Sequence, residues 1–184
     1  MAFLVKRFGG DNLWFAVGHC RTGAESAARA SAKQRLRQNL ERLLRLTGCP
    51  KMSARTESFS HLPDSTWAVV AANCRIGIDA ATAAEFPAGY PLHRVFRPVE
   101  LASGLSPACL WSLKEAVAKA AGCGFDGLNP LDIRLWTERG VATLDGDTRA
   151  VWRLWSRRPA ADTWVAVAAA ADGTCRRQAD QRID

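Results

Sequence analysis

The sequence predicts an α+β protein built from two related halves, and three observations lead to this. Two predicted helices end in glycine, at Gly48 and Gly122, and predicted strands follow each of them. An apolar segment at residues 66–72, TWAVVAA, recurs at residues 163–169 as TWVAVAA. Short apolar runs rich in valine are typical of buried strands. A short match in alanine and valine can also arise by chance, so the duplication depends equally on the repeated order of helix and strand.

The first half is predicted to span residues 1–75. Its helix carries leucines on one face and ends where Gly48 and Pro50 interrupt the pattern. The leucines on this face are Leu36, Leu40, Leu43 and Leu44. A strand at residues 66–73 follows. After an Asn-Cys-Arg turn, residues 76–79 are expected to continue that strand or to form its hairpin partner.

The second half is predicted to span residues 76–184. Residues 80–106 are rich in proline and glycine and are expected to form loops and short turns. The second helix begins at Ser106, because serine caps helices and the proline that follows is tolerated in the first turn. A turn with the sequence DGD at 145–147 is expected to join two strands. The strands are expected at residues 133–136, 141–144, 150–156 and 163–170.

Composition limits the possible classes of protein. The 184 residues suffice for one compact domain. The net charge of +7 suits an anionic partner such as nucleic acid, a phosphorylated cofactor or an acidic protein. The six cysteines show no Cys-x-x-Cys spacing, so a structural zinc site is not expected. We find no signal peptide and no membrane-spanning segment, and we therefore expect a cytoplasmic protein with reduced thiols.

Two carboxylates are candidate metal ligands. Asp79 ends the motif IGID, and the helix motif WSLKEAVAK places Trp111, Glu115 and Lys119 opposite the apolar face. Carboxylates from two elements, together with water and phosphate oxygens, commonly hold Mg²⁺. The alternatives are an ordinary solvated Glu115–Lys119 pair and an aspartate that caps a turn. Gly77 lacks a side chain, so another group can approach this strand closely.

A Ser-His pair, Ser60-His61, lies directly before the strand at residues 66–73. A histidine that occurs alone is more often structural than catalytic. Such a pair could nevertheless donate two hydrogen bonds to a phosphate.

The chain resembles the 4′-phosphopantetheinyl transferases in four motifs and their order. These are FSH at 59–61, then TWAVVAA, then IGID, and then WSLKE followed by Lys119. The closer likeness is to the pseudo-dimeric branch typified by the surfactin-synthetase activator, and it is clearest over residues 58–125. The resemblance implies two pseudo-symmetric halves packed as an intramolecular pseudo-dimer, with coenzyme A and Mg²⁺ in the cleft between them. It also implies a monomer, since one chain supplies both halves of the site.

The resemblance further implies a reaction and a role for each matching residue. The family moves the phosphopantetheine arm of coenzyme A to a serine of an acyl or peptidyl carrier protein and releases adenosine 3′,5′-bisphosphate. Asp79 and Glu115 would bind Mg²⁺, and Glu115 would also accept the serine proton. Lys119 would stabilise charge on a phosphate, with Lys114 at the mouth of the site. The residues expected at the 3′-phosphate are His61 with Ser60 and, by position alone, Arg29, Lys33, Lys51 and Arg55.

Two departures from the family pattern matter. Many members carry a third acidic metal ligand where this chain has Ala81, and the residues that flank Ser-His here are Phe59 and Leu62. The first departure favours a second hypothesis, a degenerate relative that binds coenzyme A or a carrier protein without transferring anything. A small basic nucleic-acid binder ranks last, because no helix-turn-helix or aromatic RNA-binding motif is visible. We therefore expect neither a nucleic acid nor a membrane as partner.

Overall fold

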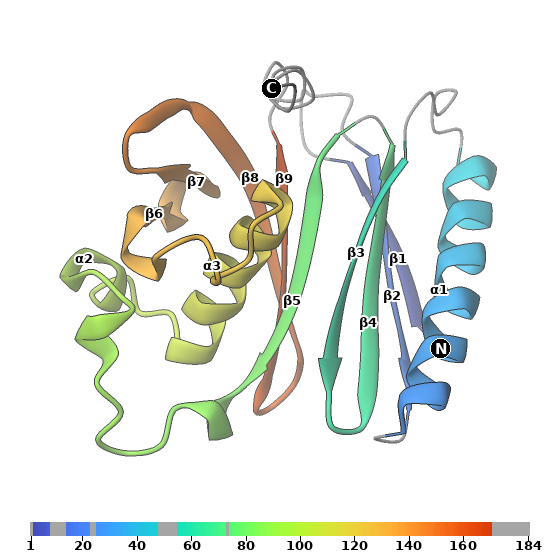
Figure 1. Cartoon of the computed structure of the whole chain (residues 1–184), viewed down its shortest axis with the longest axis horizontal. Helices are drawn as coiled ribbons and strands as arrows, with labels where there is room; N and C mark the ends of the chain where they lie inside the picture. Colours follow the sequence, from blue (N-terminus) through green and yellow to red (C-terminus); the bar gives the residue numbers. More distant parts are fainter. Residues whose placement is uncertain (1, 8–13, 23–24, 48–54, 73, 171–184) are drawn as a thin grey trace, which may run out of the picture.

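Two antiparallel β-sheets pack face to face, and one long helix covers the outer side of each sheet (Figure 1). The computed structural model describes residues 2–7, 14–22, 25–47, 55–72 and 74–170 of the 184. The predicted α+β class is confirmed. None of the described helices combines the length and the apolar character needed to cross a membrane.

The first sheet has the strand order β1-β2-β4-β3, with every neighbouring pair antiparallel. Helix α1 (Ser26–Leu46) lies between β2 and β3 in the chain and packs on β2 and β4. The four strands are β1 (Ala2–Arg7), β2 (Trp14–Arg21), β3 (Arg55–Leu62) and β4 (Ser65–Ala72).

The second sheet has the order β5-β9-β8-β7-β6 and is also antiparallel throughout. Helix α3 (Pro107–Ala121) packs on β5 and β9. The strands are β5 (Ile76–Thr82), β6 (Ile133–Trp136), β7 (Val141–Leu144), β8 (Asp147–Ala160) and β9 (Thr163–Ala170). The shorter elements are η1 (Ala83–Glu85), η2 (Leu92–Arg94), α2 (Pro98–Leu101), η3 (Pro130–Asp132) and η4 (Thr137–Arg139).

The position of β4 between two apolar layers explains its uninterrupted apolar run from Trp67 to Ala72. Trp67, Val69 and Ala71 belong to the cluster between the two sheets, whereas Ala68 and Val70 belong to the cluster under α1. Successive side chains of a strand point to opposite faces, so a strand that is covered on both faces needs apolar residues at every position. All eight residues of β4 are buried.

The repeated TWAVVAA segment occupies equivalent positions in the two sheets. The first copy lies in β4 and the second in β9. In β9, Val165, Val167 and Ala169 face the first sheet, and Ala166 and Ala168 face α3, the same alternation as in β4. The strand order β2-β4-β3 of the first sheet corresponds to β5-β9-β8 of the second.

The predicted ends of the second helix are confirmed. The Ser106 hydroxyl accepts a hydrogen bond from the Cys109 backbone N–H at 3.3 Å, and Gly122 ends α3 with a φ of 86°. A residue with a side chain would be strained at this positive φ. Helix α1 ends at Leu46, and the predicted stop signals, Gly48 and Pro50, lie outside the described residues.

The prediction that residues 76–79 extend the strand at 66–73 or form a hairpin with it is wrong. Residues 76–82 form β5, which begins the second sheet and pairs with β9. The Ser-His pair also differs from expectation, because it lies within β3 and not in a segment leading into a strand. Strands β1, β2 and β3 were not predicted, and the two-residue turn at Pro63 and Asp64 joins β3 to β4.

Candidate functional site

Asp79 is a buried carboxylate at the boundary between the two sheets. Its side chain projects from β5, and the residue is only 3% exposed. Its Oδ1 accepts hydrogen bonds from Ser60 Oγ at 2.9 Å and from Lys119 Nζ at 2.8 Å. Burial raises the pKa of Asp79 to about 6, and the charge of Glu115 adds to this, while Lys119 and the two hydrogen bonds oppose it. An acid of this kind in a pocket is a candidate functional group.

Glu115 and Lys119 lie one helical turn apart on α3 and face Asp79. Lys119 Nζ is 3.4 Å from Glu115 Oε1 and 2.8 Å from Asp79 Oδ1. The distance between Asp79 Oδ1 and Glu115 Oε1 can therefore be no greater than the sum of these two distances. The ammonium lies between them, where it balances part of their combined negative charge.

Gly77 allows α3 to approach β5 closely enough for these contacts. A Cβ atom at this position would lie 2.1 Å from the Ala116 carbonyl oxygen and 2.6 Å from the Ala120 nitrogen. Contacts this short are sterically forbidden, and both atoms belong to the helix backbone. The prediction that Gly77 permits a close approach is confirmed, and the approaching element is the helix that carries Glu115 and Lys119.

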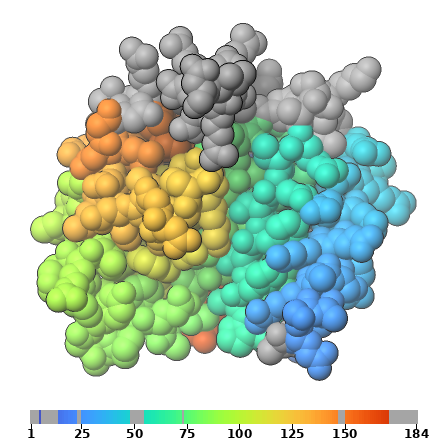
Figure 2. Space-filling view, in the orientation of Figure 1, coloured from blue at the N-terminus to red at the C-terminus, as the bar shows by residue number. Residues whose placement is uncertain are grey.

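These groups line an open pocket of about 530 Å³ between the two sheets. The first sheet contributes the turn between β3 and β4 and the end of β3, and the second contributes β5, η1 and α3. In Figure 2, the teal segment that includes β3 lies directly against the yellow and green segments of the second half. The lining residues that matter for its chemistry are Ser60, His61, Asp79, Glu85, Glu115 and Lys119.

His61 lies at the pocket among cationic side chains. Its Nδ1 is 3.0 Å from Thr66 Oγ1, so Nε2 is the ring nitrogen left to meet a ligand. Burial lowers the pKa of His61, and the charges of Lys33, Arg29 and Lys119 lower it further. Arg29 Nε is buried without a hydrogen-bond partner among the described residues. A cluster of donors in which one buried N–H is unsatisfied suits an anionic ligand.

Comparison with known proteins agrees with this geometry. A family model of the 4′-phosphopantetheinyl transferase superfamily matches residues 75–168, about half of the chain. The chain belongs to the 4′-phosphopantetheinyl transferase superfamily. The match runs from the start of β5 nearly to the end of β9 and includes Asp79, Glu115 and Lys119. A search of curated proteins returns no match.

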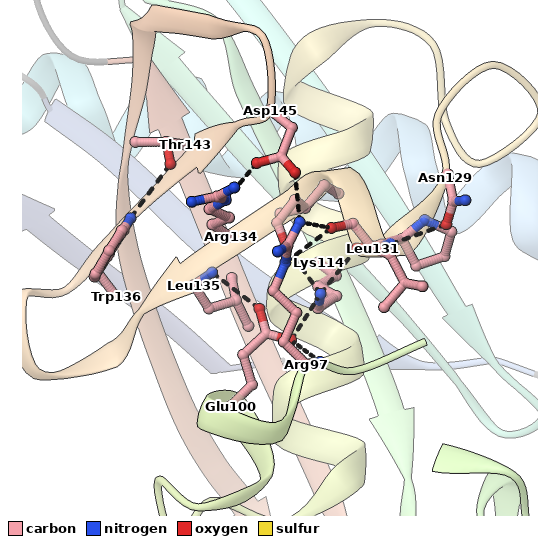
Figure 3. Close-up of polar contacts among 12 residues, drawn as sticks. Arg97, Glu100, Lys114, Asn129, Leu131, Arg134, Leu135, Trp136, Thr143 and Asp145 are labelled. Carbon is pink, nitrogen blue, oxygen red and sulfur yellow. Dashed lines mark hydrogen bonds and ion pairs between the residues drawn. The ribbon is translucent and has the colours of Figure 1, made fainter. Parts of the chain in front are cut away.

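The site of this transferase-superfamily chain differs from the prediction at Lys114, which does not reach the pocket. Its side chain is fully buried, and Nζ lies 2.8 Å from Glu100 Oε2, 2.8 Å from the Pro130 carbonyl oxygen and 2.9 Å from that of Ile133 (Figure 3). Burial lowers the pKa of Lys114, and Glu100 opposes this shift. Residues one apart on a helix point about 100° apart, so Lys114 and its neighbour Glu115 lie on different faces.

The Glu100 carboxylate is itself fully engaged. It accepts hydrogen bonds from the backbone N–H groups of Arg97 at 2.9 Å and Leu135 at 3.0 Å, in addition to its contact with Lys114 (Figure 3). Helices α2 and α3 and strand β6 are joined through this one buried ion pair. Lys114 is therefore a structural residue that holds α3 in place.

Among the basic residues predicted at the 3′-phosphate, the structure separates Arg55 from the others. Arg55 is the first residue of β3 and forms an ion pair with Glu41 of α1. His61 lies six residues further along the strand, roughly 20 Å away at the rise of a β-strand. Arg29 and Lys33 lie in the first two turns of α1, near His61. Lys51 lies outside the described residues.

Ser60 also differs from its predicted role. Neighbouring residues of a strand point to opposite faces, so Ser60 and His61 are directed apart. Ser60 is 5% exposed, and its hydroxyl is bonded to Asp79, whereas His61 contacts Thr66 of the neighbouring strand β4. Both residues line the pocket, but the Ser60 hydroxyl is bonded to Asp79, so joint binding of one phosphate by the two side chains stays a prediction.

The donor atoms present fit a magnesium-type site only in part. Asp79 and Glu115 supply carboxylate oxygens, the ligand type that Mg²⁺ prefers, and Mg²⁺ usually keeps several waters or phosphate oxygens as well. Ala81 is buried and supplies no third acid. Within the described part of the chain, no three His, Cys, Asp or Glu side chains are grouped as a metal site. Two protein ligands are compatible with a metal that a substrate diphosphate helps to hold.

Glu85 is a pocket residue that the sequence analysis missed. Its Oε1 accepts a hydrogen bond from the Thr82 backbone N–H at 2.7 Å, which caps the short helix η1. The spacing Thr82-x-x-Glu85 is that of a capping box, and this pattern would have located the residue in the sequence. Glu85 adds negative charge at the outer edge of the pocket.

Proposed function

We propose that this protein transfers 4′-phosphopantetheine from coenzyme A to a serine hydroxyl of an apo acyl or peptidyl carrier protein, in a Mg²⁺-dependent reaction that releases adenosine 3′,5′-bisphosphate. Membership of the superfamily supports the activity class. The observation that carries the proposal for this chain is the contact of one ammonium, Lys119, with two carboxylates from separate elements, Asp79 and Glu115, in a pocket between the sheets.

The residues have distinct roles in this reaction. Asp79 and Glu115 would hold Mg²⁺, which supplies charge neutralisation for the diphosphate of coenzyme A. Lys119 stabilises negative charge on the phosphate oxygens as the bond to the leaving group breaks. His61, with Arg29 and Lys33 from α1, binds the 3′-phosphate of the nucleotide, which agrees with the position of His61 in the pocket wall and with the effect of both cations on its pKa.

The chemical step is a single phosphoryl substitution. The serine oxygen of the carrier protein forms a bond to the phosphorus that bears the pantetheine arm, and the bond from that phosphorus to the bridging oxygen breaks. The serine proton passes to Glu115, directly or through a water molecule. The bridging oxygen leaves with adenosine 3′,5′-bisphosphate. Glu115 has a side-chain exposure of 30%, so a hydroxyl entering from solvent can reach it.

We also propose that the chain is an intramolecular pseudo-dimer with halves at 1–75 and 76–184. Three observations support this: the shared strand order of the two sheets, the equivalent positions of β4 and β9, and the helix on each outer face. In such an arrangement the first half contributes nucleotide contacts and the second contributes the acids. One chain then provides a complete site.

The decisive experiment incubates purified protein with Mg²⁺, coenzyme A and a panel of apo carrier proteins from fatty-acid, polyketide and peptide synthases. Mass spectrometry should detect addition of the phosphopantetheine arm to at least one of them. Asp79→Ala and Glu115→Ala should abolish the addition while circular dichroism shows a folded protein. Asp126→Ala, which removes an exposed carboxylate outside the pocket, should retain it. Absence of modification across the whole panel would reject the proposal.

One observation favours a second candidate, a non-catalytic relative that binds coenzyme A or a carrier protein. The third acid found in many members is replaced by buried Ala81, which leaves two carboxylates at the pocket's inner wall. Calorimetry separates the candidates. Tight binding of coenzyme A without turnover in either Mg²⁺ or Mn²⁺ would identify the protein as the non-catalytic relative.

A further inference from the structure

Side-chain hydroxyls of β3 join the two sheets where β3 and β5 run side by side. Ser58 Oγ accepts a hydrogen bond from the Ile78 backbone N–H at 3.2 Å, and Ser60 Oγ accepts one from the Ala80 N–H at 3.1 Å. Thr56 Oγ1 donates to the Cys74 carbonyl oxygen. We call Thr56, Ser58 and Ser60 the hydroxyl row. Because the residue numbers of the partners rise together, the two strands run parallel, as Figure 1 also shows.

The hydroxyl row bonds backbone groups of the second sheet's edge: the two serines accept from N–H groups of β5, and Thr56 donates to a carbonyl just before β5. β3 and β5 are edge strands of different sheets, and an edge strand presents backbone groups that have no partner within its own sheet. Buried backbone N–H groups need hydrogen-bond acceptors, and the serine hydroxyls supply them. This explains why alternate residues on the face of β3 that meets β5 are hydroxyl-bearing and not apolar.

Ser60 differs from the other two because it also contacts a charged side chain of the candidate site. A serine hydroxyl has one proton to donate. The Ser60 hydroxyl oxygen accepts a hydrogen bond from the Ala80 N–H. The hydroxyl proton is donated to Asp79 Oδ1 at 2.9 Å. Ser60 is 5% exposed, so water does not compete freely for this hydrogen bond.

The contacts of Asp79 divide unequally between its two oxygens. Oδ1 accepts a hydrogen bond from Ser60 Oγ and another from Lys119 Nζ. Among the described residues no donor contacts Oδ2. Two donors on the same oxygen, one from β3 and one from α3, fix the rotation of the carboxylate about its Cβ–Cγ bond and leave Oδ2 available for a cation.

We propose that Ser60 is a positioning residue that orients the Asp79 carboxylate for metal binding, and that it is not a phosphate ligand. The inference rests on the proposed function, because it assigns Asp79 to a divalent cation. If Ser60 has this role, the affinity of the second half of the chain for a metal depends on a hydroxyl from the first half. Hydrogen-bond partners of metal ligands commonly affect affinity in this way, since an unrestrained ligand must be ordered when the metal binds.

The test measures Mn²⁺ binding to the full-length protein by the electron paramagnetic resonance signal of free Mn²⁺. Ser60→Ala should weaken binding by about tenfold or more. Ser58→Ala is the matched control, because Ser58 belongs to the same row and accepts a similar backbone hydrogen bond but touches no carboxylate. It should change the affinity less than twofold. Ser60→Thr, which keeps a hydroxyl, should restore most of the wild-type affinity.

A second measurement addresses the phosphate role. Binding of adenosine 3′,5′-bisphosphate without metal should be weakened by His61→Ala and unchanged in Ser60→Ala. Equal Mn²⁺ affinities for Ser60→Ala and Ser58→Ala would overturn the inference, as would loss of bisphosphate binding in Ser60→Ala with Mn²⁺ affinity intact. If thermal denaturation shows that Ser60→Ala is unfolded, Ser60→Cys, whose thiol is a weak donor, replaces it.

Asp79→Asn separates failure of this inference from failure of the proposed metal site. If the wild-type protein binds Mn²⁺ and Asp79→Asn abolishes that binding, the metal assignment stands and the Ser60 variants alone decide the inference. If Mn²⁺ binding is insensitive to Asp79→Asn, the metal assignment and the role of Ser60 are both overturned.

Discussion

Lys119 Nζ lies 2.8 Å from Asp79 Oδ1, and this ion pair links α3 to β5 inside the pocket. The same nitrogen is 3.4 Å from Glu115 Oε1. A lysine between two carboxylates neutralises part of their charge and keeps them close together. A divalent cation bound at these carboxylates would compete with the lysine, and the displaced ammonium would be free to move toward a phosphate.

We predict that Lys119→Gln strengthens Mn²⁺ binding while it weakens transfer. Removal of the competing ammonium should tighten binding by about fivefold, or roughly 1 kcal/mol, the scale of a partly exposed ion pair. Transfer should fall because the phosphate loses a cation. Free Mn²⁺ is measured by electron paramagnetic resonance and transfer by mass spectrometry. Arg94→Gln removes the same charge from an exposed position outside the pocket and should change neither quantity. Weaker Mn²⁺ binding in Lys119→Gln would contradict the prediction.

We predict that Asp79→Asn makes the metal-free protein more stable than wild type at pH 7.5, and that the difference shrinks as the pH falls to 4. The pKa of Asp79 is raised from 3.8 to about 6 by burial. Between these values the folded protein keeps a proton that the unfolded chain releases, so rising pH favours unfolding of the wild type. The difference should reach on the order of 3 kcal/mol above pH 7.

Urea unfolding of both proteins in a chelator, at several pH values, measures this difference. Asp126→Asn, at an exposed position, should show no comparable change with pH. The prediction is contradicted if the wild type becomes more stable relative to Asp79→Asn as the pH rises from 4 to 7.

We predict that Gly77→Ala destabilises the protein by about 3 kcal/mol or more, because overpacking against backbone atoms cannot be relieved by rotation of a side chain. The added methyl group would lie 2.1 Å from the Ala116 carbonyl oxygen, so α3 must move away from β5. Binding of Mn²⁺ should weaken in parallel, since that movement separates Glu115 from Asp79. Thermal and urea unfolding measure the loss.

Gly127→Ala is the control for Gly77→Ala, because its Cβ would meet nothing closer than 3.4 Å. It should change the free energy of unfolding by no more than about 0.5 kcal/mol. Similar losses in the two variants would show that the close approach of α3 is not the cause.

We predict that Lys114→Met destabilises the protein by about 3 to 5 kcal/mol, since it leaves the Glu100 carboxylate buried without its cation. The double variant Lys114→Met with Glu100→Gln should recover part of this loss. The glutamine oxygen can still accept a backbone hydrogen bond, and no buried charge remains. Urea unfolding of the two variants provides the comparison. If the Lys114→Met protein is as stable as wild type, the structural role is wrong and Lys114 is again a candidate ligand contact.

Several local features followed directly from the sequence. The cap at Ser106, the stop at Gly122 and the space at Gly77 were all predicted, and the structure confirms each. The turn before β8 was also expected, and Gly146 has a φ of 80° there. These features depend on a few neighbouring residues or on the steric limits of one residue type, which is why the sequence alone was sufficient.

The first sheet was harder to predict, for a physical reason visible in β3. Its inward-facing residues include Ser58 and Ser60, whose hydroxyls satisfy backbone groups of β5. A polar residue in a buried strand face breaks the alternation of apolar and polar residues on which strand prediction depends. The partner that makes serine favourable there belongs to another sheet, so no pattern within β3 reveals it.

The sequence by itself determined the helix that carries Glu115 and Lys119, their shared face, and the buried character of the strands at 66–72 and 163–169, because helical and strand periodicity act within a few residues. Tertiary structure alone decided that Lys114 meets Glu100, that Ser60 meets Asp79, and that Arg55 pairs with Glu41 of α1. Each of these depends on which sheet edges and helix faces become neighbours. That choice depends on packing of the whole chain, where a buried charge or hydroxyl is stable only beside a partner distant in sequence.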